Sequence, residues 1–250
     1  MQRWFLFQEL TKRDFKQKYK RTVLGMGWSL LSPLLNLLVM KIVFTQFFGR
    51  NTPHYTTYLF AGNVVMSYFK ESTKGGMNAL VANKNIITKI NVPKYLLLLS
   101  KNVSSIINFG LTLVVFFAFA AMDGIVFTPK FLLLVYPIIC LILMSIGIGL
   151  VLSALFVFFK DIQYLYDIFL VLLTYLSAIF YRVDAYAPGF QNLFMLNPVY
   201  AVIRYVRMIV IDGAIPSGIH HLMLISYAML ALGGGILLYK KKNHQFLYYL

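Results

Sequence analysis

Six long apolar runs alternate with short polar segments along this chain of 250 residues. The runs cover about 28–48, 58–80, 96–121, 131–159, 163–181 and 219–239. A helix rises about 1.5 Å per residue, so about 20 apolar residues cross a hydrocarbon core of about 30 Å. The pattern predicts an all-α integral membrane protein with six transmembrane helices, in which residues 1–250 form a single transmembrane domain.

The segment 3–20, before the first run, has a different pattern. Apolar residues recur there at roughly helical spacing, against a basic face: Trp4, Phe7, Leu10 and Phe15 oppose Arg13, Lys16, Lys18 and Lys20. This arrangement predicts an amphipathic helix that lies along the membrane surface, with a solvated basic tail as the alternative.

An elbow is predicted between this interface helix and the first span. Lys20 and Arg21 suit anionic headgroups, and Trp28 suits the boundary between membrane and water. Gly25 and Gly27 permit a sharp change of direction between the two helices.

Two other segments interrupt the apolar runs. Residues 81–95 are polar and basic, and they predict a small helix over 79–88 that stops before Pro93. Residues 182–217 hold two apolar pieces, broken by Pro188 and Pro198, that are each too short to span a membrane. They predict short re-entrant helices at the far membrane face, between spans five and six.

The fourth run is rich in small residues, which lets neighbouring helices approach closely.

The basic residues are divided unequally between the two ends of the predicted spans. Seventeen of the 23 lysines and arginines lie in 1–27, 70–101 and 240–242 and at Lys160. Five lie on the opposite side, and Lys41 lies inside the first span. Positive residues accumulate on the cytoplasmic side, so both termini are predicted to be cytoplasmic.

Composition supports a membrane protein and removes several other classes. Hydrophobic residues make up 60% of the chain and charged residues 12%, which is too apolar for a soluble domain of this size. The net charge of +15 is spread between apolar runs and does not form a nucleic-acid footprint. Cys140 is the single cysteine, so no internal disulfide forms. No phosphate-binding loop, catalytic group or metal-ligand spacing is present in the sequence.

Three stretches resemble ABC-2-type permeases that export polysaccharides such as O-antigen, teichoic acid and capsule. The stretch 18–34, K-Y-K-R-T-V-L-G-M-G-W-S-L-L-S-P-L, is similar to the family's N-terminal elbow. Residues 83–100 are similar to the loop and the start of its third span. Asn197-Pro198, followed by Arg204 and Arg207, resembles its external Asn-Pro segment.

The sequence departs from the family pattern in two places. Lys160 stands before Asp161 where the family usually has arginine, and Ser177-Ala178 replaces a common Ser-Pro pair. The second departure leaves the local helix geometry open.

The resemblance implies a homodimeric permease of the bacterial cytoplasmic membrane that works with two copies of a separate ATPase subunit. ATP and Mg²⁺ would bind that subunit, so this chain would bind no cofactor and would not be an enzyme by itself. The expected substrate is a polysaccharide linked to undecaprenyl or another lipid. The segment 79–92 would dock into the ATPase, through Asn85, Ile86, Ile87 and Lys89. An ordinary cytoplasmic loop is the alternative.

An external gate is predicted over 185–209. Two-fold symmetry would bring both copies of this segment together around the dimer axis. Aromatic faces offer flat platforms to sugar rings, while polar groups bond their edges. A rigid cap without substrate contact is the alternative. The residues expected near the sugar path are Tyr181, Tyr186, Phe190, Phe194, Asn197, Pro198, Tyr200 and Arg204.

Two other functional classes remain open at this point. An ABC-2-type exporter of a small molecule or a lipid shares the architecture, but it would be expected to have a larger external domain or a fused ATPase. A non-transporting scaffold or a channel subunit would not need the 79–92 segment.

Overall fold

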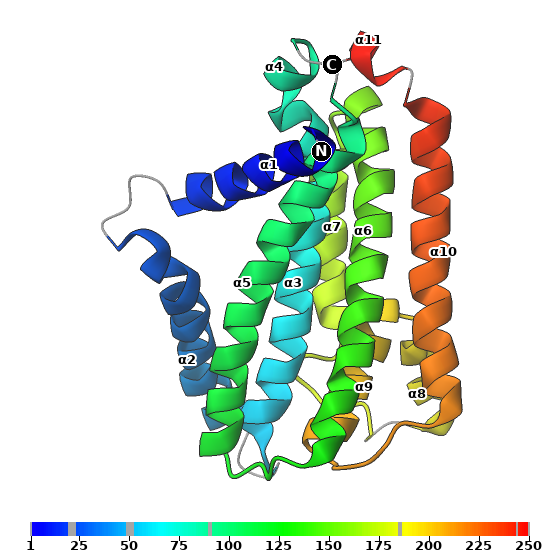
Figure 1. Ribbon diagram of the computed structural model, residues 1–250. Helices are drawn as coiled ribbons and strands as arrows, with labels where there is room; N and C mark the ends of the chain where they lie inside the picture. The colour runs from blue at the N-terminus through cyan, green and yellow to red at the C-terminus, as the bar shows by residue number, and fades with distance from the viewer. Residues whose placement is uncertain are drawn as a thin grey trace.

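The computed structural model describes residues 2–19, 24–48, 53–89, 92–184, 187–243 and 245–249. All regular structure in these ranges is helical, which confirms the all-α prediction. Four long helices run side by side along the bundle (Figure 1). They are α3 (Tyr55–Ala82), α5 (Lys94–Met122), α6 (Val135–Phe158) and α10 (Gly218–Lys242).

The remaining helices extend this bundle or cover its ends. A 3₁₀ turn (Gly25–Gly27) leads into α2 (Trp28–Phe48), which stands against α5 and α3, while α7 (Ile162–Leu176) lies beside α6 (Figure 1). Three helices share one end with both chain termini: α1 (Gln2–Tyr19), α4 (Lys84–Ile87) and α11 (Phe246–Tyr249). A second 3₁₀ turn (Pro129–Leu134), α8 (Pro188–Met195) and α9 (Pro198–Val210) lie toward the opposite end.

Four segments of the described chain are long and apolar enough to cross a membrane. They are Trp28–Thr45, Lys94–Met122, Pro129–Phe158 and Gly218–Lys242. Helix α3 has 28 residues, but it contains Lys70, Glu71 and Lys74. Helix α7 has 15 residues, which gives roughly 22 Å, less than a hydrocarbon core. The six-span topology therefore stays a prediction.

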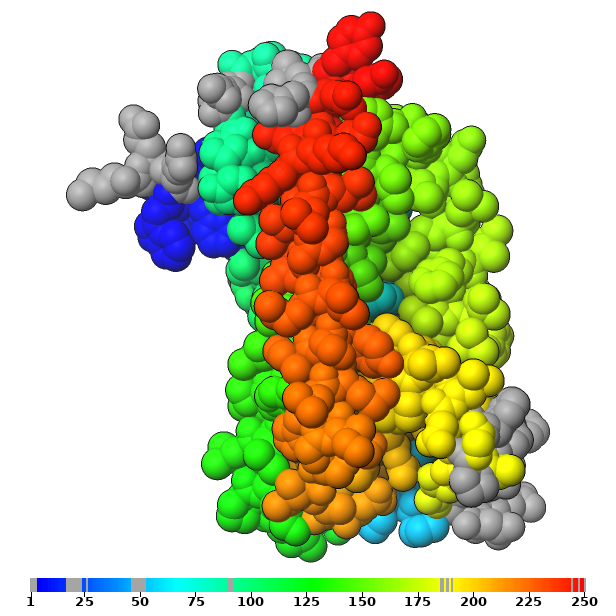
Figure 2. Space-filling model, turned by 90° about the vertical axis from the view of Figure 1, so that its right-hand side faces the viewer, coloured from blue at the N-terminus to red at the C-terminus, as the bar shows by residue number. Residues whose placement is uncertain are grey.

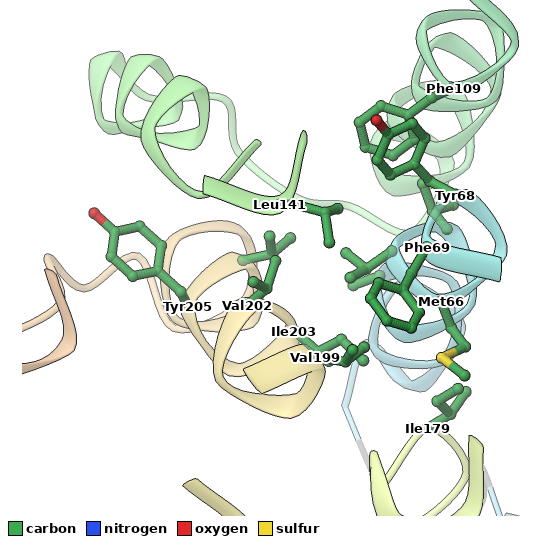
Figure 3. Close-up of a cluster of buried hydrophobic side chains, with 14 of the residues drawn as sticks. Met66, Tyr68, Phe69, Phe109, Leu141, Ile179, Val199, Val202, Ile203 and Tyr205 are labelled. Carbon is green, nitrogen blue, oxygen red and sulfur yellow. The ribbon is translucent and has the colours of Figure 1, made fainter. Parts of the chain in front are cut away.

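The main buried cluster lies where α3, α5, α6 and α9 meet. Figure 3 shows side chains from these helices turned toward one another, including Phe69, Phe109, Leu141, Val202 and Ile203. Most residues of α9 are buried, so this short helix belongs to the core of its end of the bundle. Cover of this kind is what a short, non-spanning helix would need at membrane depth.

Close packing of α6 depends on glycine at two positions. A Cβ atom on Gly147 would lie 2.3 Å from the carbonyl carbon of Ala231 in α10. A Cβ atom on Gly76 of α3 would lie 2.9 Å from the Cα of Gly149 in α6. The small residues of the fourth apolar run therefore allow the predicted close approach.

The helix predicted over 79–88 is not one continuous element. Helix α3 continues to Ala82, and α4 is a separate turn from Lys84 to Ile87. Asn83 stands between them, and its side-chain amide donates to the carbonyl of Ala79 at 2.8 Å. This side-chain bond to the preceding turn stabilises the end of α3 and separates the two helices.

Helix α10 lies at the surface along the height of the bundle (Figure 2). Ile219, Leu222, Leu230 and Leu237 are exposed on it. A row of exposed large apolar side chains is unfavourable in water and suits contact with lipid.

Candidate functional site

One end of the bundle is basic and contains the segment predicted to dock an ATPase. Helix α1 lies across this end, at a large angle to the long helices (Figure 1). Lys84 begins α4, Lys101 pairs with Asp14 of α1, and Lys94 donates to the Asn243 carbonyl after α10, so these lysines belong to the same end. The end that holds both chain termini is thus also the end where the basic residues gather.

A buried carboxylate holds α1 onto the bundle. The side chain of Asp14 is 1% exposed and lies 2.8 Å from the guanidinium of Arg13 and 3.0 Å from the Lys101 amine. The Ser100 hydroxyl also donates to it at 2.9 Å. Two cations and a hydroxyl compensate the desolvation of this carboxylate. The partners on α5 therefore fix where α1 lies.

The same network reaches the segment after α3. Arg13 donates to the side-chain oxygen of Asn83 at 2.7 Å. Asn83 directly precedes α4, so one arginine connects α1 to the start of the predicted coupling segment. Arg13 was predicted as part of the interface helix and elbow, and its contacts give it this connecting position.

The four predicted ATPase contacts lie differently in the structure. Asn85 and Lys89 are exposed, and Ile86 is partly buried. Ile87 is 5% exposed and packs in a cluster with Leu80 and other apolar residues of this end. Three of the four predicted contacts, Asn85, Ile86 and Lys89, therefore lie at the surface of α4 and the residues after it, together with exposed Lys84 and Thr88, while Ile87 packs inward.

The elbow is described in part. Gly25 has a φ of 51°, a left-handed conformation that favours glycine, and Trp28 begins α2 with its side chain exposed. Gly27 completes the turn between them. Lys20 and Arg21 lie outside the described residues.

At the opposite end, a buried arginine joins α3, α9 and the segment after α7. The Arg207 guanidinium donates to the carbonyls of Tyr58, Ala178 and Ile179 at 3.0–3.2 Å. It also lies 3.4 Å from the centroid of the Tyr58 ring. Four hydrogen bonds to carbonyl oxygens compensate the burial of its charge. Gly62 makes this contact possible, because a Cβ there would lie 2.9 Å from a guanidinium nitrogen.

Long-range contacts cover the end of α7 and the residues after it. The helix, predicted over 163–181, stops at Leu176, and Ala178 adopts a φ of 46°. The carbonyl of Leu176 accepts from the Asn197 amide, while Arg207 binds the carbonyls of Ala178 and Ile179 just beyond the helix. The Tyr58 hydroxyl further donates to the carbonyl of Tyr181 at 2.7 Å.

Three of the predicted gate aromatics form a small cluster. Phe194 of α8 lies 6.3 Å from the ring of Tyr181 and 5.5 Å from that of Tyr200. Tyr200 is buried, and the other two are partly buried. Tyr186 lies outside the described residues, and so does the side chain of Phe190.

The polar members of the predicted gate have structural partners. The Asn197 side chain accepts from the backbone N–H groups of Val199 and Tyr200, which makes it the N-cap of α9. Pro198 occupies the first helical position, where its missing N–H has no cost. Arg204 pairs with Asp184 at 3.3 Å.

Sequence reasoning did not single out Asp14 or assign a role to Arg207. The sequence does indicate that Asp14 faces inward. It lies four residues after Leu10 and therefore shares the apolar face of the helix. Arg207 was named only through resemblance, because its carbonyl partners lie about 30 and 150 residues away.

The fold and its two ends define a class: a helical membrane protein with a basic end that holds both chain termini and two short helices, α8 and α9, toward the other end. The chain belongs to the ABC-2 type transporter family, whose profile matches residues 5–211.

Several curated relatives match over nearly their whole length. An O-antigen export system permease protein RfbA of Myxococcus xanthus is 24% identical over 96% of this chain and 94% of its own. The protein of the same name from Klebsiella pneumoniae is 26% identical over 95% and 92%. The polysialic acid transport protein KpsM of Escherichia coli is 22% identical over 96% and 94%.

Proposed function

We propose that this chain is the permease subunit of an ATP-driven exporter of a cell-surface polysaccharide. The observation that supports this most directly is similarity over more than nine tenths of the chain to permeases named for O-antigen export and polysialic acid transport. Because the similarity includes both ends of the molecule, it covers the docking end as well as the membrane core. The transported chain is proposed to be lipid-linked.

The energy source is proposed to be a separate ATPase, present in two copies, that binds ATP and Mg²⁺. Its docking surface would be the exposed part of α4 beside α1. Asn85 and Lys89 offer polar contacts there, and Ile86 offers an apolar one. The Asp14 network would hold α1 and the start of α4 together when the ATPase pulls on them.

The permease is proposed to act as a homodimer in the bacterial cytoplasmic membrane, with both termini in the cytoplasm. The position of the basic residues at the end that holds the termini supports this orientation. The segment 185–209 is proposed to form the external gate near the dimer axis. The cluster of Tyr181, Phe194 and Tyr200 would then open as polysaccharide passes.

Deletion of the gene tests the proposal. Polysaccharide should disappear from the cell surface and accumulate inside, and a plasmid with the wild-type gene should reverse both changes. Periodate staining of surface and interior fractions measures them. Unchanged surface polysaccharide, together with accumulation of a lipid or a small molecule, would identify the other kind of exporter. No accumulation of any compound would indicate a scaffold.

A further inference from the structure

A polar cleft lies between α2, α3 and α5 and begins at the elbow residue Trp28. Its volume is about 490 Å³, room for roughly sixteen water molecules at about 30 Å³ each. Ligand sites typically have volumes of about 300–1,000 Å³. The lining residues are Trp28, Ser29, Ser32, Pro33, Asn36, Leu37, Asn63, Ser67, Glu71, Asn108 and Thr112.

Helix α3 presents a regular polar stripe to this cleft. Asn63, Ser67 and Glu71 follow one another at intervals of four residues, which places them on one helix face. Ser67 is exposed, although its neighbours Met66 and Tyr68 are buried. The stripe therefore faces the cleft and not the packed core.

The two other helices complete the polar lining. Helix α2 supplies serines and an asparagine at 29, 32 and 36, and α5 supplies Asn108 and Thr112. Ser32 and Asn36 are exposed within α2, one of the candidate membrane spans. The Asn108 amide donates to the Glu71 carboxylate at 2.8 Å across the cleft. Polar groups inside membrane helices are costly, and they commonly mark the path of a substrate.

The chemistry of this lining favours a sugar over a lipid tail. Serine and asparagine side chains both donate and accept hydrogen bonds, as sugar hydroxyls do. Trp28 adds an aromatic face for the apolar side of a sugar ring. A separate cavity of about 290 Å³ beside Leu98, Leu150 and Leu232 is lined mainly by apolar side chains and suits an acyl chain better. The molecule thus keeps a polar and an apolar cavity on different helix faces.

We propose that the cleft is a glycan-binding part of the export path. Ser32, Asn36, Asn63 and Ser67 hydrogen-bond to sugar hydroxyls as the polymer passes. Trp28 stacks against a ring. This inference rests on the proposed export function, and it adds the place and the chemistry of recognition inside the membrane.

Photo-crosslinking in exporting cells tests the site whatever the sugar composition of the polymer. p-Benzoylphenylalanine replaces Ser67, or Asn36 if the bulky residue at 67 prevents membrane insertion. The control position is Ile107, an exposed apolar residue of α5 outside the cleft lining. Ultraviolet light should give a periodate-stained ladder on the purified permease at the cleft position and none at 107. Capture of phospholipid alone, or equal ladders at both positions, would overturn the inference.

A second measurement tests the hydrogen bonds. Ser32→Ala with Ser67→Ala should slow export about three- to tenfold for each lost bond, with normal permease levels. Ser153→Ala in α6 is the control, because its buried hydroxyl has no hydrogen-bond partner among the described residues. Normal export by the double variant would contradict the role of these hydroxyls.

If the wild-type gene restores surface polysaccharide but the cleft captures none, the cleft proposal alone fails. If the wild-type gene restores none, the export function itself fails.

Discussion

Replacement of Asp14 by asparagine is the sharpest test of how α1 is held. The change keeps the size of the side chain and removes the charge between Arg13 and Lys101. The asparagine can still accept the hydrogen bond from Ser100, so the loss between α1 and α5 falls on the ion pair with Lys101. We expect α1 to separate more easily from the bundle.

The free-energy cost of this substitution follows from how deeply the Asp14 side chain is buried. Breaking a fully buried ion pair costs about 3–5 kcal/mol. Here the carboxylate is buried, but the side chain of Lys101 is 27% exposed and regains water or headgroup contacts when released. Solvent screening lowers the cost to about 2 kcal/mol. At 1.4 kcal/mol per factor of ten, the open population rises about thirtyfold.

Cysteine labelling measures this opening in membranes. Leu10 lies on the buried face of α1 and is 5% exposed, so a cysteine at this position reacts only when the helix separates. Cys140 is replaced by alanine so that Leu10→Cys is the one reactive thiol. The maleimide reaction should be about thirtyfold faster with Asp14→Asn. Glu9→Gln is the matched control, since Glu9 forms an exposed pair with Lys12. An equal rate for Asp14→Asn and Glu9→Gln would refute the reasoning.

Three other substitutions test the remaining parts of the argument. Ile86→Asp should abolish export and weaken co-purification of the ATPase about thirtyfold, because loss of an apolar anchor costs roughly 2 kcal/mol of binding free energy. Unchanged co-purification would show that α4 is not part of the docking surface. Gly147→Val should prevent α10 from packing and eliminate the monodisperse peak in size-exclusion chromatography, whereas Gly233→Ala, which meets open space, should not. Arg207→Lys should lower the melting temperature, because a lysine amine cannot reproduce the hydrogen bonds of the planar guanidinium. Arg182→Lys, at an exposed position, should leave it unchanged. Equal melting temperatures of the two variants would contradict the role of the four bonds to carbonyl oxygens.

The long helices could be predicted from the sequence because their apolar runs are uninterrupted. The first run was predicted over 28–48, the bounds of α2, and 96–121 lies within α5. Hydropathy is a local property, so it locates such helices well. It could not locate the end of α7, because the contacts there come from Asn197 and Arg207, about 20 and 30 positions further along the chain. A helix C-terminus set by a tertiary contact leaves no local pattern.

The candidate sites were predictable to a smaller extent. Asn85 and Lys89 are exposed as docking would require, but the inward direction of Ile87 depends on packing against Leu80. The polar stripe of α3 could have been predicted, because Asn63, Ser67 and Glu71 follow one another at intervals of four residues. The cleft could not, because it needs α2, α3 and α5 side by side.

Helix α3 connects the two ends of the molecule. Its Tyr58 carbonyl accepts from Arg207 at one end, and Asn83, directly after it, accepts from Arg13 at the other. The continuous helix between them is roughly 36 Å long, and Gly76 packs its C-terminal part against α6. A rigid helix held in this way transmits a displacement better than it absorbs one. An ATPase that moves α4 should therefore also move the segment after α7, because Tyr58 and Arg207 hold its carbonyls to α3.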